Sequence, residues 1–418
     1  MRKFEIDSEK VANLKRFFTY LNPTALETRI RKLNITFDLP RKVSVFVYDK
    51  YRYEFALQRI LAQLSNGDLS FDSDDTTIQQ SFTFAESFNR ILDTLDATEQ
   101  RRLIRRLNGR LNDAHGLAPM EFEFATASDM SRMGFRVTSG EAEKLRFDWL
   151  ATRDSIEFEI ECKHMSFDRG KEIHGDTFQQ IADDLIAAAT PYADASRRVF
   201  LFTIVASDKV EKGQVSSGSL GQSWKRAFES GNQSGEFFSL RWSCIPIEPN
   251  GMPELLTPIW SRLVPPHLQF PIDTSSVIAT AKIGSGGYGV VVEAVSQLPD
   301  QLPKYVREEL NKASKRQLTG RRPSSIFVHL SDLDEKTFIK WRELDYCGAS
   351  SFKQIAKEIF DKRPHVHSIV FSGRHRPTPP LEPIETHFPY SLIPRTTSMT
   401  YRYYNSRCIF DHVRDFRF

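Results

Sequence analysis

The sequence contains few cysteines and no long apolar run. Its 418 residues include only four cysteines, and no two of them stand close together: Cys162, Cys244, Cys347 and Cys408. A zinc knuckle and a dense disulfide framework are therefore excluded, and we expect a reducing compartment. No stretch of about eighteen apolar residues occurs, and residues 1–5 pass directly into polar sequence. These absences predict a cytoplasmic protein without a membrane segment.

The chain also lacks a strong charge of either sign. It contains 57 lysines and arginines against 54 aspartates and glutamates, which gives a formal net charge of +3 at pH 7. This balance makes no general case for a polyanionic partner, so a nucleic-acid site would have to be a local basic patch. The hydrophobic fraction of 40% excludes gross disorder, and the length predicts two or three domains.

Several familiar catalytic motifs are missing. Without a Gly-x-Ser-x-Gly elbow, serine hydrolase chemistry has no nucleophile. The glycine-rich segment Gly284 to Gly289 matches the loop of protein kinases, but no strand lysine, His-Arg-Asp loop or Asp-Phe-Gly triplet follows it. We interpret it as a tight turn closing a hairpin. His365 and His367 lack further ligands at metal-binding spacing and are interpreted as strand residues.

Residues 1–118 are predicted to form an N-terminal mixed, mainly helical region. A strand is expected over 42–48, followed by helices over 52–64, 77–95 and 97–111. Asp96 is the expected N-cap of the last helix, with Glu99 three residues later. That helix is the most basic in the chain and carries Arg101, Arg105 and Arg106.

Residues 119–206 have the clearest order of elements. We expect a helix to residue 133, strands over 135–137, 145–150 and 156–163, a helix over 176–189 and a closing strand over 199–205. Residues 207–236 are interpreted as a polar insertion or linker.

Residues 237–418 are expected to form a C-terminal α/β region. Its clearest signals are a helix over 305–318, a strand over 325–330, a helix over 336–361 with a break near residue 348, and a strand over 366–371. A proline-rich segment and an aromatic, basic tail follow.

One strand pair in the central region carries acidic residues. Residues two apart on a strand point to the same face, so Glu161 and Lys163 should project side by side, and a hairpin partner can bring Asp148 next to them. Two converging carboxylates suit Mg²⁺ or Mn²⁺ far better than zinc. An alternative interpretation is a half-solvated strand, because Glu157, Glu159, Glu161 and Lys163 all fall on one face.

The segment 119–206 resembles the PD-(D/E)xK nuclease superfamily. The motif acid corresponds to Asp148, preceded here by Phe147 instead of proline, and the (D/E)xK triplet corresponds to Glu161-Cys162-Lys163. Many members place a glutamate on the preceding helix, which a Gly-aromatic pair closes; Glu123 and the pair Gly134-Phe135 fit that pattern. Some members add a glutamine on the following helix, where Gln179 and Gln180 stand.

Helical periodicity independently selects Glu123. It shares a stripe with Met120, Ala127 and Met130, so its side chain should point inward, whereas Glu121 should not.

The resemblance implies an α/β fold whose central restriction-endonuclease-like mixed sheet is flanked by helices, between an N-terminal α+β region and a C-terminal α/β region. It also implies that Asp148, Glu161 and the carbonyl of Cys162 hold Mg²⁺ or Mn²⁺, with Glu123 as an additional or second-metal ligand. Lys163 would position the nucleophile or stabilise the pentacovalent phosphorus. Gln179 or Gln180 would assist by hydrogen bonding.

The function implied is a metal-dependent nuclease acting on nucleic acid, with DNA favoured and a restriction-like or anti-phage defence role as an analogy. The alternative is a non-catalytic nucleic-acid-binding or assembly protein that keeps the fold. A homo-oligomer or partner protein is left open. Candidate phosphate contacts, against the equally weighted interpretation of solvated helix faces, are Arg101, Arg105, Arg106, Lys315 and Arg316.

Overall fold

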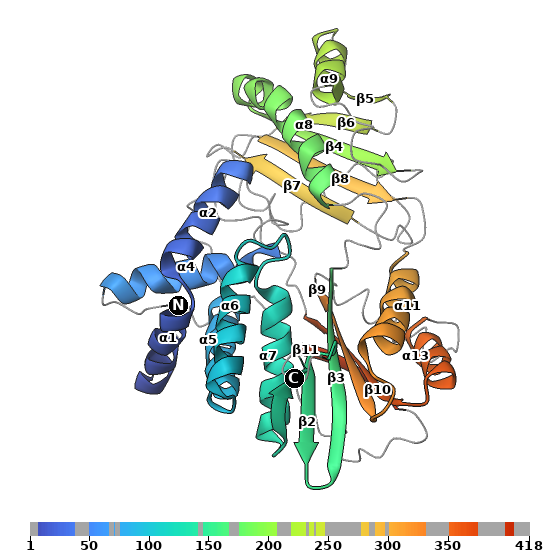
Figure 1. Cartoon of the computed structure of the whole chain (residues 1–418). Coiled ribbons are helices and arrows are strands. Elements are labelled where there is room, and N and C mark those ends of the chain that lie inside the picture. Colours follow the sequence, from blue (N-terminus) through green and yellow to red (C-terminus); the bar gives the residue numbers. More distant parts are fainter. Residues whose placement is uncertain are drawn as a thin grey trace.

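The computed structural model contains a helical N-terminal region and two separate β-sheets (Figure 1). The chain is therefore a mixed α/β protein. In the described residues, no helix is long and apolar enough to cross a membrane. The structure describes residues 7–37, 50–66, 71, 76–140, 145–166, 175–206, 219–230, 234–237, 240–246, 277–283, 289–296, 301–331, 351–374 and 398–404.

Five helices make up the described N-terminal region: α1 (Ser8–Tyr20), α2 (Pro23–Phe37), α4 (Arg52–Asn66), α5 (Thr76–Asp93) and α6 (Ala97–Arg110). The predicted N-cap of α6 is confirmed, because the Asp96 carboxylate accepts hydrogen bonds from the N–H groups of Thr98 and Glu99. Edge-to-face aromatic contacts among Phe17, Phe84 and Phe88 fill the space between α1 and α5. The strand expected over 42–48 lies outside the described residues.

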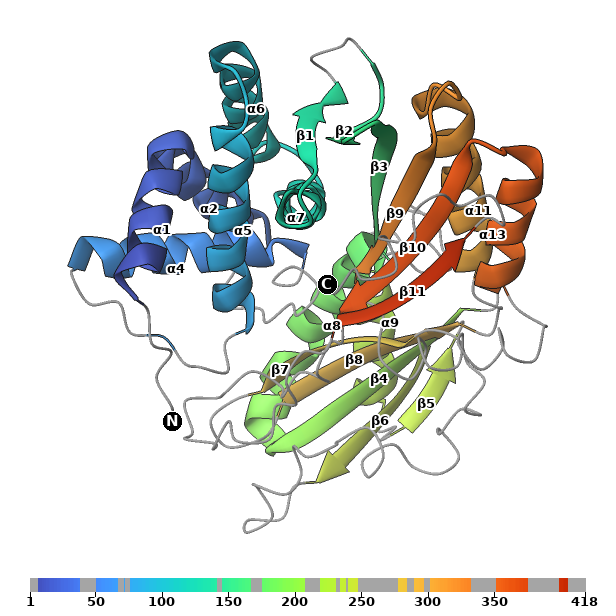
Figure 2. The same cartoon turned by 90° about the horizontal axis from the view of Figure 1, so that it is seen from below.

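Helix α7 (Ala118–Arg132) lies between the N-terminal helices and a sheet (Figure 2). Pro119 occupies its first turn, and Gly134, with φ of 84°, follows its C-terminal end in the left-handed conformation that glycine adopts readily. The prediction that Glu121 faces outward is wrong. Glu121 is only 3% exposed, because neighbouring elements enclose α7 and leave it no solvated face.

The first sheet has the strand order β1-β2-β3-β9-β10-β11. Its strands β3, β9 and β10 are parallel, whereas the other neighbours are antiparallel. Helix α7 packs on one face, and α11 (Leu302–Lys312) and α13 (Ser351–Lys362) supply the core of the other. The strands are β1 (Arg136–Ser139), β2 (Trp149–Arg153), β3 (Ile156–Ser166), β9 (Ser324–Ser331), β10 (Val366–Arg374) and β11 (Ser398–Tyr404).

The second sheet has the order β5-β6-β4-β8-β7 and a hydrophobic core of its own. Helices α8 (Gly175–Ser196) and α9 (Ser219–Glu229) pack on it, with Trp224 between Phe200 and Trp242. The strands are β4 (Arg198–Ala206), β5 (Ser234–Phe237), β6 (Leu240–Pro246), β7 (Val277–Ile283) and β8 (Gly289–Ser296).

The order of strands differs from the expectation that 119–206 forms one continuous unit. Strand β4 belongs to the second sheet, and the parallel neighbour of β3 is β9, about 160 residues further along. The region expected as a polar insertion contains α9 and β5, and the region after residue 237 is divided between both sheets. The pattern of β4 specifies a strand buried on both faces but not the sheet to which it belongs.

The bounds of several elements differ from the expected ones, and two of these differences lie next to the cavity described below. Strand β2 starts at Trp149 and leaves residues 145–148 outside the ladder. The helix predicted over 305–318 starts at Leu302 and changes at Ala313 into a π-helical turn, η4 (Ala313–Gln317).

Candidate active site

Asp148 stands where strand β2 separates from strand β3. The regular ladder ends at the pair Trp149 and Ile160, and one further bond joins the Asp148 N–H to the Ile160 carbonyl at 3.1 Å. The Asp148 carboxylate then accepts a hydrogen bond from the Cys162 N–H at 2.7 Å. A side chain thus takes the place of the next backbone acceptor, and β2 no longer covers this edge of β3.

Glu161 and Lys163 follow on the same face of β3, as their spacing predicts. The two side chains form an ion pair, and the Glu161 residue is only 1% exposed. Its second carboxylate oxygen, Oε2, is buried and has no hydrogen-bond partner among the described residues. An unsatisfied buried carboxylate oxygen is costly, which makes this position a natural one for a cation.

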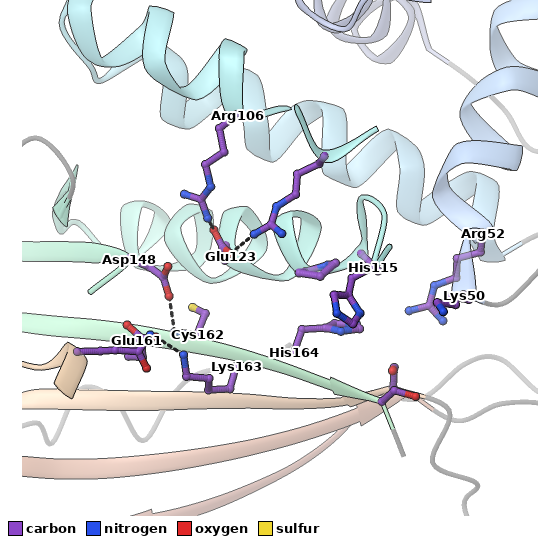
Figure 3. A pocket seen from close by; sticks show the side chains of 16 residues that line it. Lys50, Arg52, Arg106, His115, Glu123, Asp148, Glu161, Cys162, Lys163 and His164 are labelled. Atoms are coloured by element: carbon purple, nitrogen blue, oxygen red, sulfur yellow. Dashed lines mark hydrogen bonds and ion pairs between the residues drawn. The ribbon is translucent and has the colours of Figure 1, made fainter. Parts of the chain in front are cut away.

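Glu123 approaches the same place from helix α7. The prediction that this side chain points inward is confirmed, since the residue is 6% exposed and lines the same cavity as Asp148 and Glu161. Its carboxylate is paired with the guanidinium of Arg106 on α6, and Arg110 lies 3.9 Å away. The separation of β2 from β3 allows residues from both sides of the sheet to meet in one place (Figure 3).

These side chains line a cavity of about 400 Å³ that is acidic on one side and basic on another. Asp148, just before β2, and Glu161 and Lys163 on β3 lie on one side, whereas Lys50, Arg52 and His115 face them from the N-terminal helical region (Figure 3). Gln317, at the end of η4, also lines the cavity. An anion that entered here would meet both the basic side and any cation held by the carboxylates.

Burial controls the protonation of the acidic groups. It raises the pKa of Glu123 to about 7, with a further contribution from the charge of Asp148. Burial also raises the pKa of Glu161 well above its usual range, although Lys163 opposes that shift. Burial alone would lower the pKa of Lys163, but the Glu161 and Asp148 carboxylates raise it, so the ammonium group stays charged. Because their pKa values are raised, Glu123 and Glu161 hold protons that a bound metal cation would displace.

The chemistry of the site suits a divalent cation that prefers oxygen ligands. Asp148 and Glu161 are hard anionic donors, and the Glu161 Oε2 atom lacks a hydrogen bond. Among the described side chains, however, no three His, Cys, Asp or Glu already converge as metal ligands. Glu123 is turned towards Arg106 and Glu161 towards Lys163, so a cation would take ligands from existing ion pairs.

The other predicted site residues lie apart from this cavity or carry no side-chain description. Helix α8, which carries Gln179 and Gln180, packs on the second sheet, and Gln180 is exposed. The side chain of Gln179 lies outside what the structure describes. Arg101 and Arg105 are on the exposed side of α6, and Lys315 and Arg316 are exposed on η4. Of the five arginines and lysines proposed to bind phosphate, Arg106 lines the cavity.

Sequence reasoning did not assign several residues that line the cavity: Lys50, Arg52, Arg110, His115, His164 and Gln317. Arg110 had a usable signal, because it stands four residues after Arg106 on a helix and therefore on the same face. Lys50 and Arg52 had none, because they are separated from Glu161 by more than a hundred residues.

Two motifs set aside from the sequence lie elsewhere. Strands β7 and β8 pair antiparallel with Ile283 opposite Gly289, as expected for a hairpin around the glycine-rich segment, although residues 284–288 are outside the described part. His367 is on strand β10, and His365 precedes it with Nε2 located 3.2 Å from the Ser314 carbonyl.

Comparisons with known protein families, curated proteins and solved structures give no match to this chain. The functional assignment therefore depends on the chemistry and geometry of the cavity.

Proposed function

We propose that the protein is a divalent-metal-dependent nuclease that hydrolyses phosphodiester bonds, with a restriction-endonuclease-like core. One observation carries the proposal. Asp148, Glu161 and Lys163, together with Glu123, line a single cavity at the point where β2 leaves β3. Buried carboxylates that could hold a cation, next to a charged lysine, are an arrangement suited to phosphoryl chemistry.

The topology of the first sheet supports the same proposal. The superfamily that the sequence resembles has the order helix, three strands, helix, strand. The elements α7, β1, β2, β3, α11 and β9 follow that order. Strand β9 is parallel to β3, and the second sheet is inserted between β3 and α11 (Figure 1). The core would then be discontinuous in sequence, extending from residue 118 to residue 331 around an insertion.

Each residue of the cavity would have a defined task. Asp148, Glu161 and the Cys162 carbonyl would hold Mg²⁺ or Mn²⁺, and the bound ion would activate water and neutralise charge on the transition state. Lys163, whose ammonium group is held by Glu161, would orient the attacking water or contact a non-bridging phosphate oxygen. Glu123 and Arg106 would complete the wall next to this position.

The basic side of the cavity supports a nucleic acid as the substrate. Lys50, Arg52 and His115 face the carboxylates across the cavity and would contact phosphates next to the scissile one (Figure 3). The resemblance to the nuclease superfamily favours DNA as the substrate. If the protein forms no product, the alternative is a protein that binds nucleic acid without cleaving it.

The decisive experiment compares wild-type protein with Asp148→Asn. Plasmid, linear duplex, single-stranded DNA and RNA are each incubated with Mg²⁺, Mn²⁺ or EDTA, and products are separated on gels. We expect metal-dependent products from at least one substrate and none with the variant. Binding that is insensitive to EDTA, without cleavage of any substrate, would support the non-catalytic alternative. Equal cleavage by the variant would assign the chemistry elsewhere.

A further inference from the structure

Arg106 has an unusual position for a residue on a highly basic helix. Arg101 and Arg105 on the same helix are exposed, but the Arg106 side chain turns into the cavity and pairs with the buried Glu123 carboxylate (Figure 3). Arg110, one turn later, is held 2.7 Å from Asp113 and lies 3.9 Å from Glu123. The guanidinium of Arg106 is therefore a fixed positive charge inside the site.

This pairing affects which carboxylates remain for a metal ion. No three acidic, histidine or cysteine side chains converge as ligands in the described part of the chain. Glu123 lines the same cavity as Asp148 and Glu161, but it is held by Arg106. Two carboxylates, those of Asp148 and Glu161, remain. Glu161 is paired with Lys163 through Oε1 only, and its Oε2 atom has no hydrogen-bond partner among the described residues.

The charges in the centre of the cavity favour one divalent ion over two. The carboxylates of Glu123, Asp148 and Glu161 contribute three negative charges when ionised, and Arg106 and Lys163 contribute two positive charges. The charge of Arg110 is balanced by Asp113. One divalent ion changes the net charge of this buried group from −1 to +1, which a phosphodiester then neutralises. A second ion would leave a large uncompensated charge out of water.

From this geometry we infer that the site takes a single divalent cation and that Arg106 occupies the electrostatic place of a second one. Arg106 acts as a positioning residue: it holds Glu123 away from the ion and presents a fixed guanidinium to the phosphate. The inference rests on the proposed function, because it assumes that Asp148 and Glu161 bind a divalent cation.

Counting bound Mn²⁺ tests the inference without measuring cleavage. Calorimetric titration and the electron paramagnetic resonance signal of free Mn²⁺ are recorded for wild-type protein, Arg106→Met, Arg106→Lys and the matched control Arg105→Met. We expect one ion per chain for wild type, Arg106→Lys and the control, and two for Arg106→Met, in which Glu123 is free to bind.

A second variant keeps the test decisive if Arg106→Met does not fold. Glu123→Gln should still bind one Mn²⁺ per chain, and its affinity should fall by less than tenfold, because the variant loses one negative charge of the cavity but no ligand of that ion. A tenfold or greater loss of affinity would overturn the inference. So would two ions bound to the wild-type chain, or one ion bound to a folded Arg106→Met variant.

These outcomes separate the inference from the proposed function. Two ions on the wild-type protein would contradict only the role of Arg106, because a metal-dependent nuclease can use two. Absence of Mn²⁺ binding to wild type at millimolar concentration would contradict the metal site itself, and the inference would fail with it. A normal ion count that Asp148→Asn leaves unchanged would show that the ion binds at another place.

Discussion

Lys163 is more deeply involved in the structure than its place on a polar strand face predicts. Its side chain is 15% exposed and forms an ion pair with a carboxylate that is almost completely buried. Truncation to alanine would remove the partner of that carboxylate and open space beside it. Loss of Lys163 should therefore reduce stability as well as activity, although the raised pKa of Glu161 lets this carboxylate accept a proton when its partner is lost.

We predict that Lys163→Met lowers cleavage at least about 100-fold, since in the proposed mechanism the Lys163 ammonium group would act on the reacting groups. Binding of the same oligonucleotide should stay within about threefold, because in the proposed function the basic side of the cavity would supply most of the phosphate contacts. Cleavage rates and fluorescence anisotropy measure the two effects, and the exposed Lys32→Met is the control. Unchanged cleavage by folded Lys163→Met would remove Lys163 from the mechanism.

Glu54 is a buried carboxylate outside the cavity. Its Oε1 atom accepts a hydrogen bond from the Leu117 N–H at 3.0 Å, next to the start of α7, while Oε2 is buried without a hydrogen-bond partner among the described residues. Gly116 allows this approach, because a Cβ atom there would lie 2.2 Å from Glu54 Oε1. Burial raises the pKa of Glu54 from 4.5 to about 7.

Glu54 makes folding stability dependent on pH in a defined direction. Because folding raises its pKa, the folded state holds the proton more tightly, and this stabilisation is lost as the pH rises from 4.5 through about 7. We predict that the difference in unfolding free energy, Glu54→Gln minus wild type, is larger at pH 8 than at pH 5 by on the order of 3 kcal/mol. Denaturant unfolding at both values measures the difference. An equal difference at the two values would refute the prediction.

At the scale of elements, the start of α7 connects the N-terminal helices to the cavity. Arg29 on α2 donates to the Asp113 carbonyl, the Tyr51 hydroxyl donates to the Ala114 carbonyl, and Glu54 holds the Leu117 N–H. These contacts fix the segment between α6 and α7, which carry Arg106 and Glu123. The N-terminal helices therefore help to build the site as well as to cover one side of the sheet.

The residues at the start of α4 provide the test of this role. We predict that Lys50→Ala with Arg52→Ala weakens nucleic-acid binding and lowers the slope of log K against log salt by about 1.5 to 2, as expected for two lost phosphate contacts. The matched control, Arg101→Ala with Arg105→Ala, removes the same charge from an exposed surface and should change the slope less. Binding titrations at several salt concentrations measure both. A larger effect in the control would favour the outer face of α6 as the nucleic-acid surface.

On the scale of the whole molecule, the chain forms two sheets with separate hydrophobic cores. The core around Trp224 belongs to the second sheet and its helices α8 and α9, whereas the candidate site borders the first sheet. The chain leaves the first sheet after β3 and returns to it at α11 and β9 (Figure 1). A substitution that creates a cavity in one core should therefore destabilise the sheet of that core more than it destabilises the other sheet.

We predict that Trp224→Ala destabilises the second sheet by about 3–5 kcal/mol, because a large buried side chain leaves a cavity. Thermal unfolding should show a new transition at lower temperature, while Mn²⁺ affinity below that transition stays within about threefold of wild type. Leu330→Ala, in the core of the first sheet, should impair Mn²⁺ binding instead. A single cooperative loss of both properties in Trp224→Ala would show that the two cores unfold together.

Much of the local structure near the cavity follows from short segments of the sequence. The Asp96 cap, the inward stripe of Glu123 and the shared face of Glu161 and Lys163 follow from helix and strand periodicity, which depends on residues a few positions apart. Asp148 was also identified, although it lies just before its strand. These features are recognisable because each is encoded within about fifteen residues of sequence.

The contacts between elements that are distant in the sequence depend instead on how the whole chain packs. Strand β9, and not β4, lies beside β3. The residue at the cavity from a neighbouring helical segment is Gln317, at the end of η4, whereas α8 with Gln179 and Gln180 packs on the second sheet. The burial of Glu121 and the pairing of Arg106 with Glu123 depend in the same way on neighbours from other elements. A hydrophobic pattern fixes which face of a strand or helix is buried, but partners far apart in sequence are selected by the packing of the complete core.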